Sequence, residues 1–112
     1  MSKKFMIIVN PASSNGKTSK RWSEIKKLLL KEKIDFDFIC TEKPGDATEI
    51  ARRSPEEGYQ NIVAVGGDGT LNETINGYLS TDIEVRKKAA LGIISMGTGG
   101  DFVRTAGIPK DP

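Results

Sequence analysis

Histidine is absent from the 112-residue sequence, and cysteine occurs once. The lack of histidine excludes His-based catalytic triads, proton transfer through an imidazole and most zinc sites. The single cysteine, Cys40, excludes a disulfide within the chain and fits a reducing compartment, so we expect a cytoplasmic protein. Because Cys40 falls in a strand pattern and has no partner, we expect a buried thiol without a chemical role.

Long hydrophobic runs are also absent. No apolar stretch approaches the roughly 20 residues that span a bilayer. The apolar run near the amino terminus ends at Asn10 and Pro11, short of the roughly 7–15 apolar residues of a signal peptide. The net charge of +2 does not argue for nucleic acid, so we expect no such partner. The 37% apolar and 29% charged residues are typical of one soluble globular domain.

Strand and helix patterns alternate along the chain. The expected strands are residues 5–9, 36–41, 62–65 and 90–95. The first expected helix is residues 19–33, with Trp22, Ile25, Leu28 and Leu29 on one face, and the second is residues 46–53. A third expected helix has an apolar stripe of Leu71, Ile75, Tyr78 and Leu79, and a short fourth one begins near Asp101. The strand at 36–41 alternates apolar and polar residues, which favours the edge of the sheet. This order predicts an α/β fold of three layers, a mostly parallel sheet flanked by helices.

Glycine and hydroxyl residues follow three of the expected strands. The segments are NPASSNGK from Asn10, GGDGTLNE from Gly66 and MGTGGDF from Met96. Ligands of open parallel sheets bind outside the carboxyl ends of the strands. Glycine lets backbone N–H groups approach a ligand closely, and N–H groups at a helix N-terminus bind phosphate oxygens. The three loops together predict a phosphate-binding site, although a single glycine-rich loop is equally well explained as a tight turn.

Two common phosphate-binding motifs do not apply here. The glycine spacing is neither GxGxxG nor GxxxxGK followed by Ser or Thr, so neither a Rossmann nor a Walker A site is predicted. Thr70 and Glu73 have the spacing of a capping box at a helix start. We therefore expect Glu73 to be structural and not chemical.

The three loops resemble those of the diacylglycerol kinase catalytic-domain family, which includes bacterial lipid kinases and relatives that act on sphingosine and ceramide. The resemblance covers the whole chain and is carried by NPASSNG, Thr41 in TEKPGDA, GGDGTLNE and GTGGDFVRTAGIP. The family shares its GGDGT loop with NAD kinases and 6-phosphofructokinases, so the resemblance implies a fold like the N-terminal part of phosphofructokinase. The GTxNDF-type motif distinguishes the lipid kinases from the other GGDGT proteins.

By position, the resemblance implies ATP and Mg²⁺ as cofactors and a set of nucleotide-binding residues. These are Asn10, Pro11, Ala12, Ser13, Ser14, Thr41, Gly66, Gly67, Asp68, Gly69, Thr70, Leu71, Asn72 and Thr98. Asp68 would reach the phosphates through Mg²⁺, because a carboxylate beside polyphosphate is otherwise repelled. Orienting the turn through local N–H groups is an equally good role for Asp68. The chain departs from the family at Gly100, where the motif has Asn.

The resemblance implies that residues 1–112 form a nucleotide-binding domain and that a β-rich second domain, which binds the lipid and supplies the catalytic base, is absent. The expected reaction transfers the γ-phosphoryl group of ATP to a lipid hydroxyl such as that of diacylglycerol, in phospholipid biosynthesis. We expect this fragment alone to be inactive. An NAD kinase-like phosphotransferase and a non-catalytic nucleotide-binding or interaction module are the alternatives. Peripheral membrane contact by the full-length protein and a homodimer are left open.

Overall fold

The fold is built around one five-stranded sheet. The computed structural model describes residues 4–12, 16–95 and 102–104. The strands are β1 (Phe5–Val9), β2 (Phe36–Cys40), β3 (Asn61–Gly66), β4 (Ala90–Ser95) and β5 (Phe102–Arg104), in the spatial order β2-β1-β3-β4-β5. The first four strands are parallel, and β5 pairs antiparallel with β4. The predicted α/β class, the mostly parallel sheet and the edge position of the second strand are confirmed.

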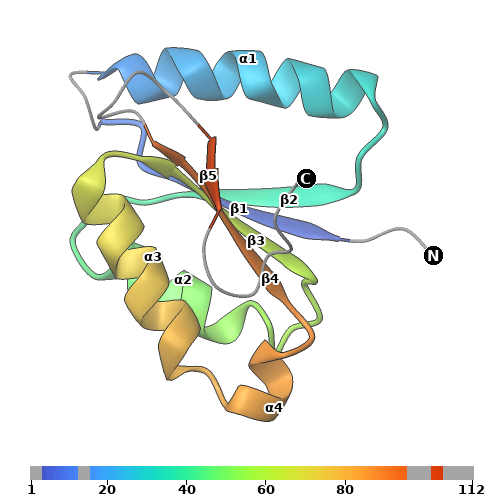
Figure 1. Ribbon diagram of the computed structural model, residues 1–112. Coiled ribbons are helices and arrows are strands. Elements are labelled where there is room, and N and C mark those ends of the chain that lie inside the picture. Colours follow the sequence, from blue (N-terminus) through green and yellow to red (C-terminus); the bar gives the residue numbers. More distant parts are fainter. Residues whose placement is uncertain (1–3, 13–15, 96–101, 105–112) are drawn as a thin grey trace.

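Four helices are described, and the long ones cover both faces of the sheet. They are α1 (Lys17–Lys31), α2 (Asp46–Arg53), α3 (Asp68–Ser80) and α4 (Ile83–Arg86). Figure 1 shows α1 along one face, whereas α2 and α3 lie together on the other. This arrangement gives the three layers that the alternation of strands and helices predicted.

The unbroken apolar run of β1 reflects burial on both faces of the sheet. Met6 and Ile8 belong to the core between the sheet and the pair α2 and α3. Ile7 and Val9 belong to the core under α1, where they pack with Trp22. Each fully buried aliphatic side chain contributes about 1.5–3 kcal/mol relative to an exposed one. The two-sided core therefore fixes the register of the central strand, since a shift by one residue would exchange its faces.

The expected helix near Asp101 is wrong for the part of that segment that the structure describes. Phe102–Arg104 is a strand, with Gly92 opposite Arg104 and Ile94 opposite Phe102. Residues 96–101 lie outside the described residues. The side of β4 away from β3 offers backbone hydrogen bonds to a further strand, and β5 takes that position.

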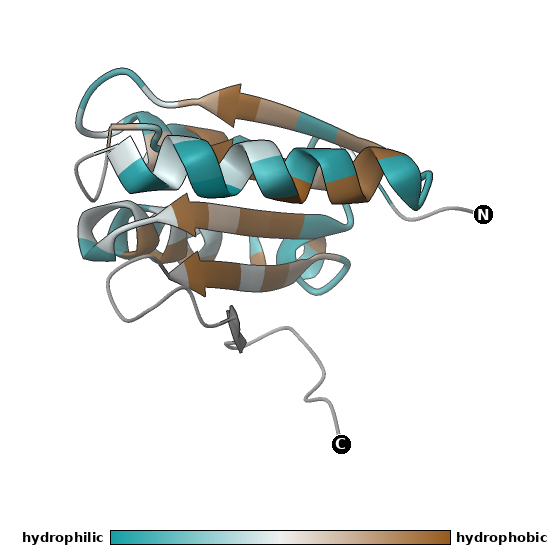
Figure 2. Cartoon of the chain, turned by 90° about the horizontal axis from the view of Figure 1, so that it is seen from above, coloured by the Kyte–Doolittle hydropathy of each residue, from teal (hydrophilic) through white to brown (hydrophobic). Residues whose placement is uncertain are grey.

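Three side chains that we expected in the core are more exposed than predicted. Leu28 is 57% exposed and Leu79 is 51% exposed, so the apolar faces of α1 and α3 are narrower than their sequence patterns. Cys40 is exposed at the end of the edge strand, which contradicts the expected buried thiol. The exposure of Cys40 follows from the edge position of β2, since Figure 2 shows α1 running along the sheet with strands visible on either side of it. Among the described residues, no helix has the length and apolarity to cross a membrane.

Aromatic side chains attach α1 to the edge strand. The ring centroid of Trp22 lies 6.2 Å from that of Phe36 in an edge-on arrangement and 5.1 Å from that of Phe38. Such pairs stabilise by about 0.5–1.5 kcal/mol beyond the area that they bury. The one tryptophan of the sequence therefore holds β2 in place next to β1.

Candidate functional site

The three long helices all begin at the edge of the sheet where the parallel strands end. Each has a glycine as its N-cap, namely Gly16 for α1, Gly45 for α2 and Gly67 for α3, and none receives a hydrogen bond from a cap side chain. The first N–H groups of a helix have no intrahelical partner, and the helix dipole makes that end positive. A glycine cap places no side chain over these groups, and at α2 the Gly45 N–H is taken by Glu73, so the start of α3 is the one of the two bordering the pocket that is suited to an anionic ligand.

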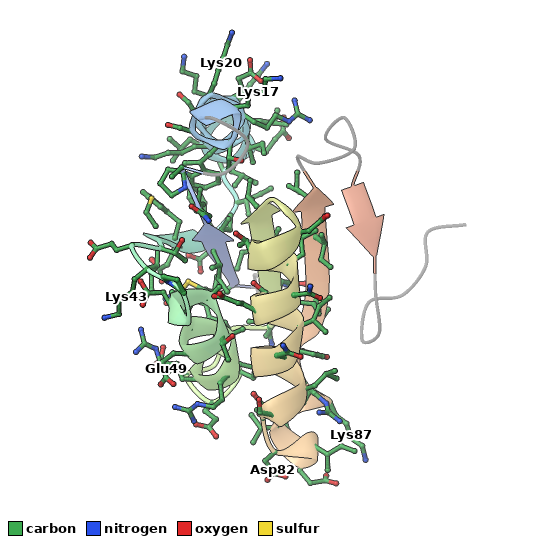
Figure 3. The ribbon with its side chains drawn as sticks, turned by 90° about the vertical axis from the view of Figure 1, so that its left-hand side faces the viewer. Lys17, Lys20, Lys43, Glu49, Asp82 and Lys87 are labelled. Atoms are coloured by element: carbon green, nitrogen blue, oxygen red, sulfur yellow. The ribbon has the colours of Figure 1, made fainter. Side chains whose placement is uncertain are left out.

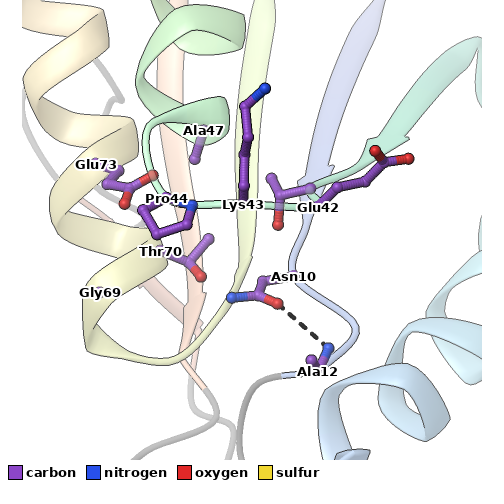
Figure 4. A pocket seen from close by; sticks show the side chains of 10 residues that line it. Asn10, Ala12, Glu42, Lys43, Pro44, Ala47, Gly69, Thr70 and Glu73 are labelled. Carbon is purple, nitrogen blue, oxygen red and sulfur yellow. Dashed lines mark hydrogen bonds between the residues drawn. The ribbon is translucent and has the colours of Figure 1, made fainter.

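A pocket of about 330 Å³ opens at this edge (Figure 4). Its walls come from the ends of β1 and β2, from the loop before α2 and from the first two turns of α3. The lining residues are Asn10, Ala12, Thr41, Glu42, Lys43, Pro44, Ala47, Gly69, Thr70 and Glu73. The volume lies at the lower end of the roughly 300–1,000 Å³ of small-molecule sites. The pocket is therefore large enough for part of a nucleotide-sized ligand.

Asn10 and Thr41 are held in the pocket by continuations of the sheet. The Asn10 N–H donates to the Val65 carbonyl over 3.1 Å, and the Thr41 N–H donates to the Val9 carbonyl over 2.7 Å. The Asn10 side-chain oxygen accepts from the Ala12 N–H at 3.2 Å, which turns the chain away from the sheet. Figure 4 shows this bond at the mouth of the pocket. The rigid strands thus position a side-chain amide and a hydroxyl beside each other.

The α3 wall combines a tightly packed residue with an open one. Thr70 is buried, and a Cβ placed on Gly66 would lie 2.8 Å from its Oγ1. A Cβ on Gly69, in contrast, would meet no atom within 4 Å among the described residues, apart from its chain neighbours and the backbone of its own helix. The first backbone bond of this turn runs from the Leu71 N–H to the Gly67 carbonyl at 3.1 Å. Gly69 therefore leaves space beside its own backbone in the wall that Thr70 and Glu73 also line.

The wall formed by the loop before α2 is ordered by two acidic side chains. Asp46 Oδ2 accepts from the N–H groups of Glu42 at 2.9 Å and Lys43 at 3.1 Å. These backbone bonds, led by the one from Glu42, hold the pKa of the Asp46 carboxyl below its usual range. Glu73 on α3 accepts from the Gly45 N–H at 3.1 Å. This wall is therefore built from its own aspartate and from a glutamate of the neighbouring helix.

The structure brings five of the sequence-predicted residues into one pocket. They are Asn10, Ala12, Thr41, Gly69 and Thr70. Six others lie beside them at the same edge but do not line the pocket: Pro11, Gly66, Gly67, Asp68, Leu71 and Asn72. Ser13, Ser14 and Thr98 lie outside the described residues. Whether these residues bind a nucleotide stays a prediction.

Four lining residues were missed by the sequence reasoning, namely Glu42, Lys43, Pro44 and Ala47. The Pro44-Gly45 turn after the second expected strand was a usable signal, because it falls at the same edge as the other loops. The expected capping box is wrong. The cap of α3 is Gly67, so Thr70 lies inside the first turn. Glu73 bonds to Gly45 and lines the pocket, so its structural role involves a different helix from the one expected.

Asp68 is the acidic residue that our interpretation assigned to Mg²⁺. It is exposed and stands in the first turn of α3. Over the described ranges, no group of three or more Cys, Asp or Glu side chains is placed to hold a metal ion. One carboxylate fits Mg²⁺ only with oxygens from a bound ligand, which is the usual arrangement of this ion with phosphates.

These features define an α/β domain with a polar pocket at the carboxyl ends of its parallel strands. The sequence model described as the diacylglycerol kinase catalytic domain matches residues 4–112. The chain belongs to this family.

Similar proteins carry the same name. The chain is 41% identical over 111 residues to a diacylglycerol kinase of Staphylococcus saprophyticus and 40% identical to one of Staphylococcus aureus. Each alignment covers 99% of this chain but only 35% and 34% of the relative, so the chain spans about a third of their length. A solved diacylglycerol kinase structure from Bacillus anthracis superposes with a TM-score of 0.69 at 29% identity, over 89% of this chain and 33% of that one.

Proposed function

We propose that this chain supplies the nucleotide site of a lipid kinase that transfers the γ-phosphoryl group of ATP to a lipid hydroxyl such as that of diacylglycerol. The observation that carries the proposal is the pocket at the strand ends, with one wall formed by the first turn of α3, whose glycine cap makes no side-chain hydrogen bond to it. Family membership supports the phosphoryl-transfer chemistry. It favours a lipid acceptor over the NAD kinase-like alternative.

The start of α3 is the part of the pocket suited to the phosphates. The N–H groups of Asp68, Gly69 and Thr70 precede the first bond of the helix, from Leu71 to Gly67. Oriented N–H groups at a helix start bind phosphate oxygens without moving, and the helix dipole adds to the attraction. The missing side chain of Gly69 lets an oxygen approach the backbone closely.

Polar side chains opposite α3 are suited to the rest of the nucleotide. Asn10 and Thr41 bring an amide and a hydroxyl to the other side of the pocket, both on backbone fixed by the sheet. The bonds of their N–H groups to the Val65 and Val9 carbonyls fix the main chain that carries these side chains before a ligand arrives. Preorganised contacts of this kind reduce the entropic cost of binding.

Mg²⁺ would neutralise the phosphate charge and would be held by Asp68 together with phosphate oxygens. Positioning and charge neutralisation supply most of the catalysis in phosphoryl transfer. We assign the base that deprotonates the lipid hydroxyl, and the lipid site itself, to a further domain of the full-length protein. This assignment agrees with the chain spanning about a third of its curated relatives.

The proposal is tested by titrating Mg-ATP and Mg-ADP into the chain by calorimetry, with two matched valine variants. Gly69→Val adds a side chain where the protein leaves open space, so the fold is expected to persist while the pocket is obstructed. Asn76→Val adds the same side chain to an exposed position two turns further along α3. We expect wild type and Asn76→Val to bind and Gly69→Val to lose at least tenfold in affinity. Equal affinity of all three, or no binding by wild type, would refute the nucleotide site.

A further inference from the structure

Two segments that are 28 residues apart in sequence are joined at the pocket by a single carboxylate. Glu73 lies in the second turn of α3, and its Oε1 accepts from the Gly45 N–H at 3.1 Å. Gly45 is in the left-handed region, with φ of 94°, and is the N-cap of α2. Figure 4 shows Glu73 next to Pro44, the residue that precedes this cap. The carboxylate therefore ties the start of α2 to the side of α3.

Residue 73 makes a second bond to the same helix start. Its carbonyl accepts from the Thr48 hydroxyl at 2.9 Å, one turn into α2. The main chain and the side chain of Glu73 thus both contact the first turn of α2. The Thr48 bond holds the two helices together, whereas the Gly45 bond reaches the loop that forms the pocket wall.

The loop before α2 is closed by hydrogen bonds of its own. Asp46 Oδ2 accepts from the N–H groups of Glu42 and Lys43, which closes the turn over residues 42–46. Thr41, at the other end, is bonded to β1 through the Val9 carbonyl. The bond from Gly45 to Glu73 is then the side-chain contact that links this wall to α3, in addition to the packing of α2 against α3.

We propose that Glu73 is a positioning residue that fixes the 41–45 wall of the pocket against α3 through the Gly45 N–H, and so sets the fit of the nucleotide. The inference rests on the proposed nucleotide site. The positioning role requires a hydrogen-bond acceptor at residue 73 and does not require a negative charge. A carboxylate that acted by charge, on Mg²⁺ or on phosphate, would instead depend on its ionisation.

Glutamine separates these two roles. Glu73→Gln keeps a carbonyl oxygen at the right reach for Gly45 and removes the charge, whereas Glu73→Ala removes both. Thr48→Val is the matched control, since it deletes the other bond between residue 73 and α2 and leaves the Gly45 tie intact. Thr48 does not line the pocket.

The experiment measures three quantities on the chain and these variants: the affinity for Mg-ADP by calorimetry, the exchange rate of the Gly45 amide proton by NMR, and thermal stability. We expect Glu73→Ala to weaken binding about tenfold and to speed Gly45 exchange by at least as much. Glu73→Gln should stay within about twofold of wild type in both quantities. Thr48→Val should lose thermal stability while its affinity and its Gly45 exchange rate stay unchanged.

Each contrary result points to a different failure. If Glu73→Gln loses affinity as Glu73→Ala does, the residue acts by charge and the positioning role is refuted. If Glu73→Ala speeds exchange of the Gly45 amide but binds Mg-ADP as wild type does, the hydrogen bond exists without affecting nucleotide affinity. The positioning role is then refuted, and the proposed nucleotide site is not. If wild type binds no nucleotide, the proposed function and this inference fail together, whatever the exchange rates show.

Discussion

The α-carbon of Gly77 lies against the backbone carbonyl of Thr48, so that any side chain at residue 77 would overlap the Thr48 oxygen and lie 3.0 Å from the Cβ of Ala51. Thr48 and Ala51 both belong to α2, so α3 approaches α2 closely at Gly77. It is flanked by the Thr48 hydroxyl bond to Glu73 and by the Thr81 hydroxyl, which donates to the Arg52 carbonyl at 2.6 Å. The two helices that border the pocket therefore pack backbone to backbone.

We predict that Gly77→Ala lowers the free energy of unfolding by about 1–3 kcal/mol. Alanine is the better helix former by roughly 0.8–1.0 kcal/mol, but the methyl group has no space because its nearest neighbour is backbone and cannot rotate away. Denaturant unfolding followed by circular dichroism measures the change.

Gly69→Ala is the matched control for this prediction, since it is the same substitution in the same helix at a position with open space. We expect it to leave stability unchanged or to raise it by up to about 1 kcal/mol. A Gly77→Ala variant as stable as Gly69→Ala would show that the helices separate easily, contrary to the close packing described here.

The sequence was sufficient for those parts of the fold that local pattern determines. Ile7 and Ile8 face opposite sides of the sheet and are both buried, so the run to which they belong could only be a central strand. The edge position of β2 followed from its alternation. Cys40 was misjudged because its exposure depends on how far α1 extends over that edge, which the residues around Cys40 do not specify.

The candidate site was predictable only where its residues follow strand ends directly. Asn10 and Gly69 could be found in this way, since parallel strands end at one edge, whereas Thr41 was given by the family resemblance. The link from Glu73 to Gly45 could not, because it joins two helices that are distant in sequence. A glutamate in a capping box bonds to the N–H of its own helix cap, and here Glu73 makes that bond to the cap of another helix. The predicted capping box was therefore wrong, because the partner of Glu73 depends on tertiary packing.

A tyrosine at the far end of the sheet gives a pH-dependent prediction. The Tyr59 hydroxyl donates to Asp37 Oδ2 at 2.5 Å, and this bond is the main cause that raises the pKa of Tyr59 to about 12. Ionised Tyr59 loses the bond and faces a carboxylate. The contribution of this pair to stability is therefore complete below about pH 10, the usual tyrosine pKa, and is lost as the pH rises from there through about 12.

We predict that Asp37→Asn lowers the pKa of Tyr59 from about 12 toward about 10. Ultraviolet absorbance of tyrosinate measures this pKa in the folded chain, and Tyr59→Phe assigns the signal because the sequence has only two tyrosines. Burial also raises the pKa of Tyr78, so the wild-type chain should show little ionisation near pH 10. An unchanged tyrosinate titration in Asp37→Asn would mean that the Asp37 carboxylate does not raise the pKa of Tyr59.

The thiol of Cys40 should react in the native chain. It is exposed at the end of the edge strand, so a thiol reagent needs no unfolding to reach it. We expect one thiol per chain to react with a chromogenic disulfide in the absence of denaturant, and Cys40→Ser to abolish the reaction. Reaction only after denaturant is added would restore the buried position that the strand pattern had indicated.

The last prediction separates binding from turnover. We expect the chain to bind Mg-ATP and yet to phosphorylate no diacylglycerol, because we assign the catalytic base and the lipid site to a further domain. A nucleotide held without an oriented acceptor gains nothing from the proximity on which phosphoryl transfer depends. Transfer of radiolabelled phosphate from ATP to diacylglycerol in mixed micelles measures the activity.

The diacylglycerol kinase of Staphylococcus saprophyticus, about a third of whose length this chain matches, is the positive control for that assay. Turnover by the 112-residue chain at a rate within about tenfold of the control would show that these residues contain the base and the acceptor site. Asp68 would then be the first acidic side chain to replace, since it stands at the start of α3 beside the pocket. Measurable binding of Mg-ATP without turnover would support the assignment of the nucleotide site to this chain and of the catalytic base and lipid site to a further domain.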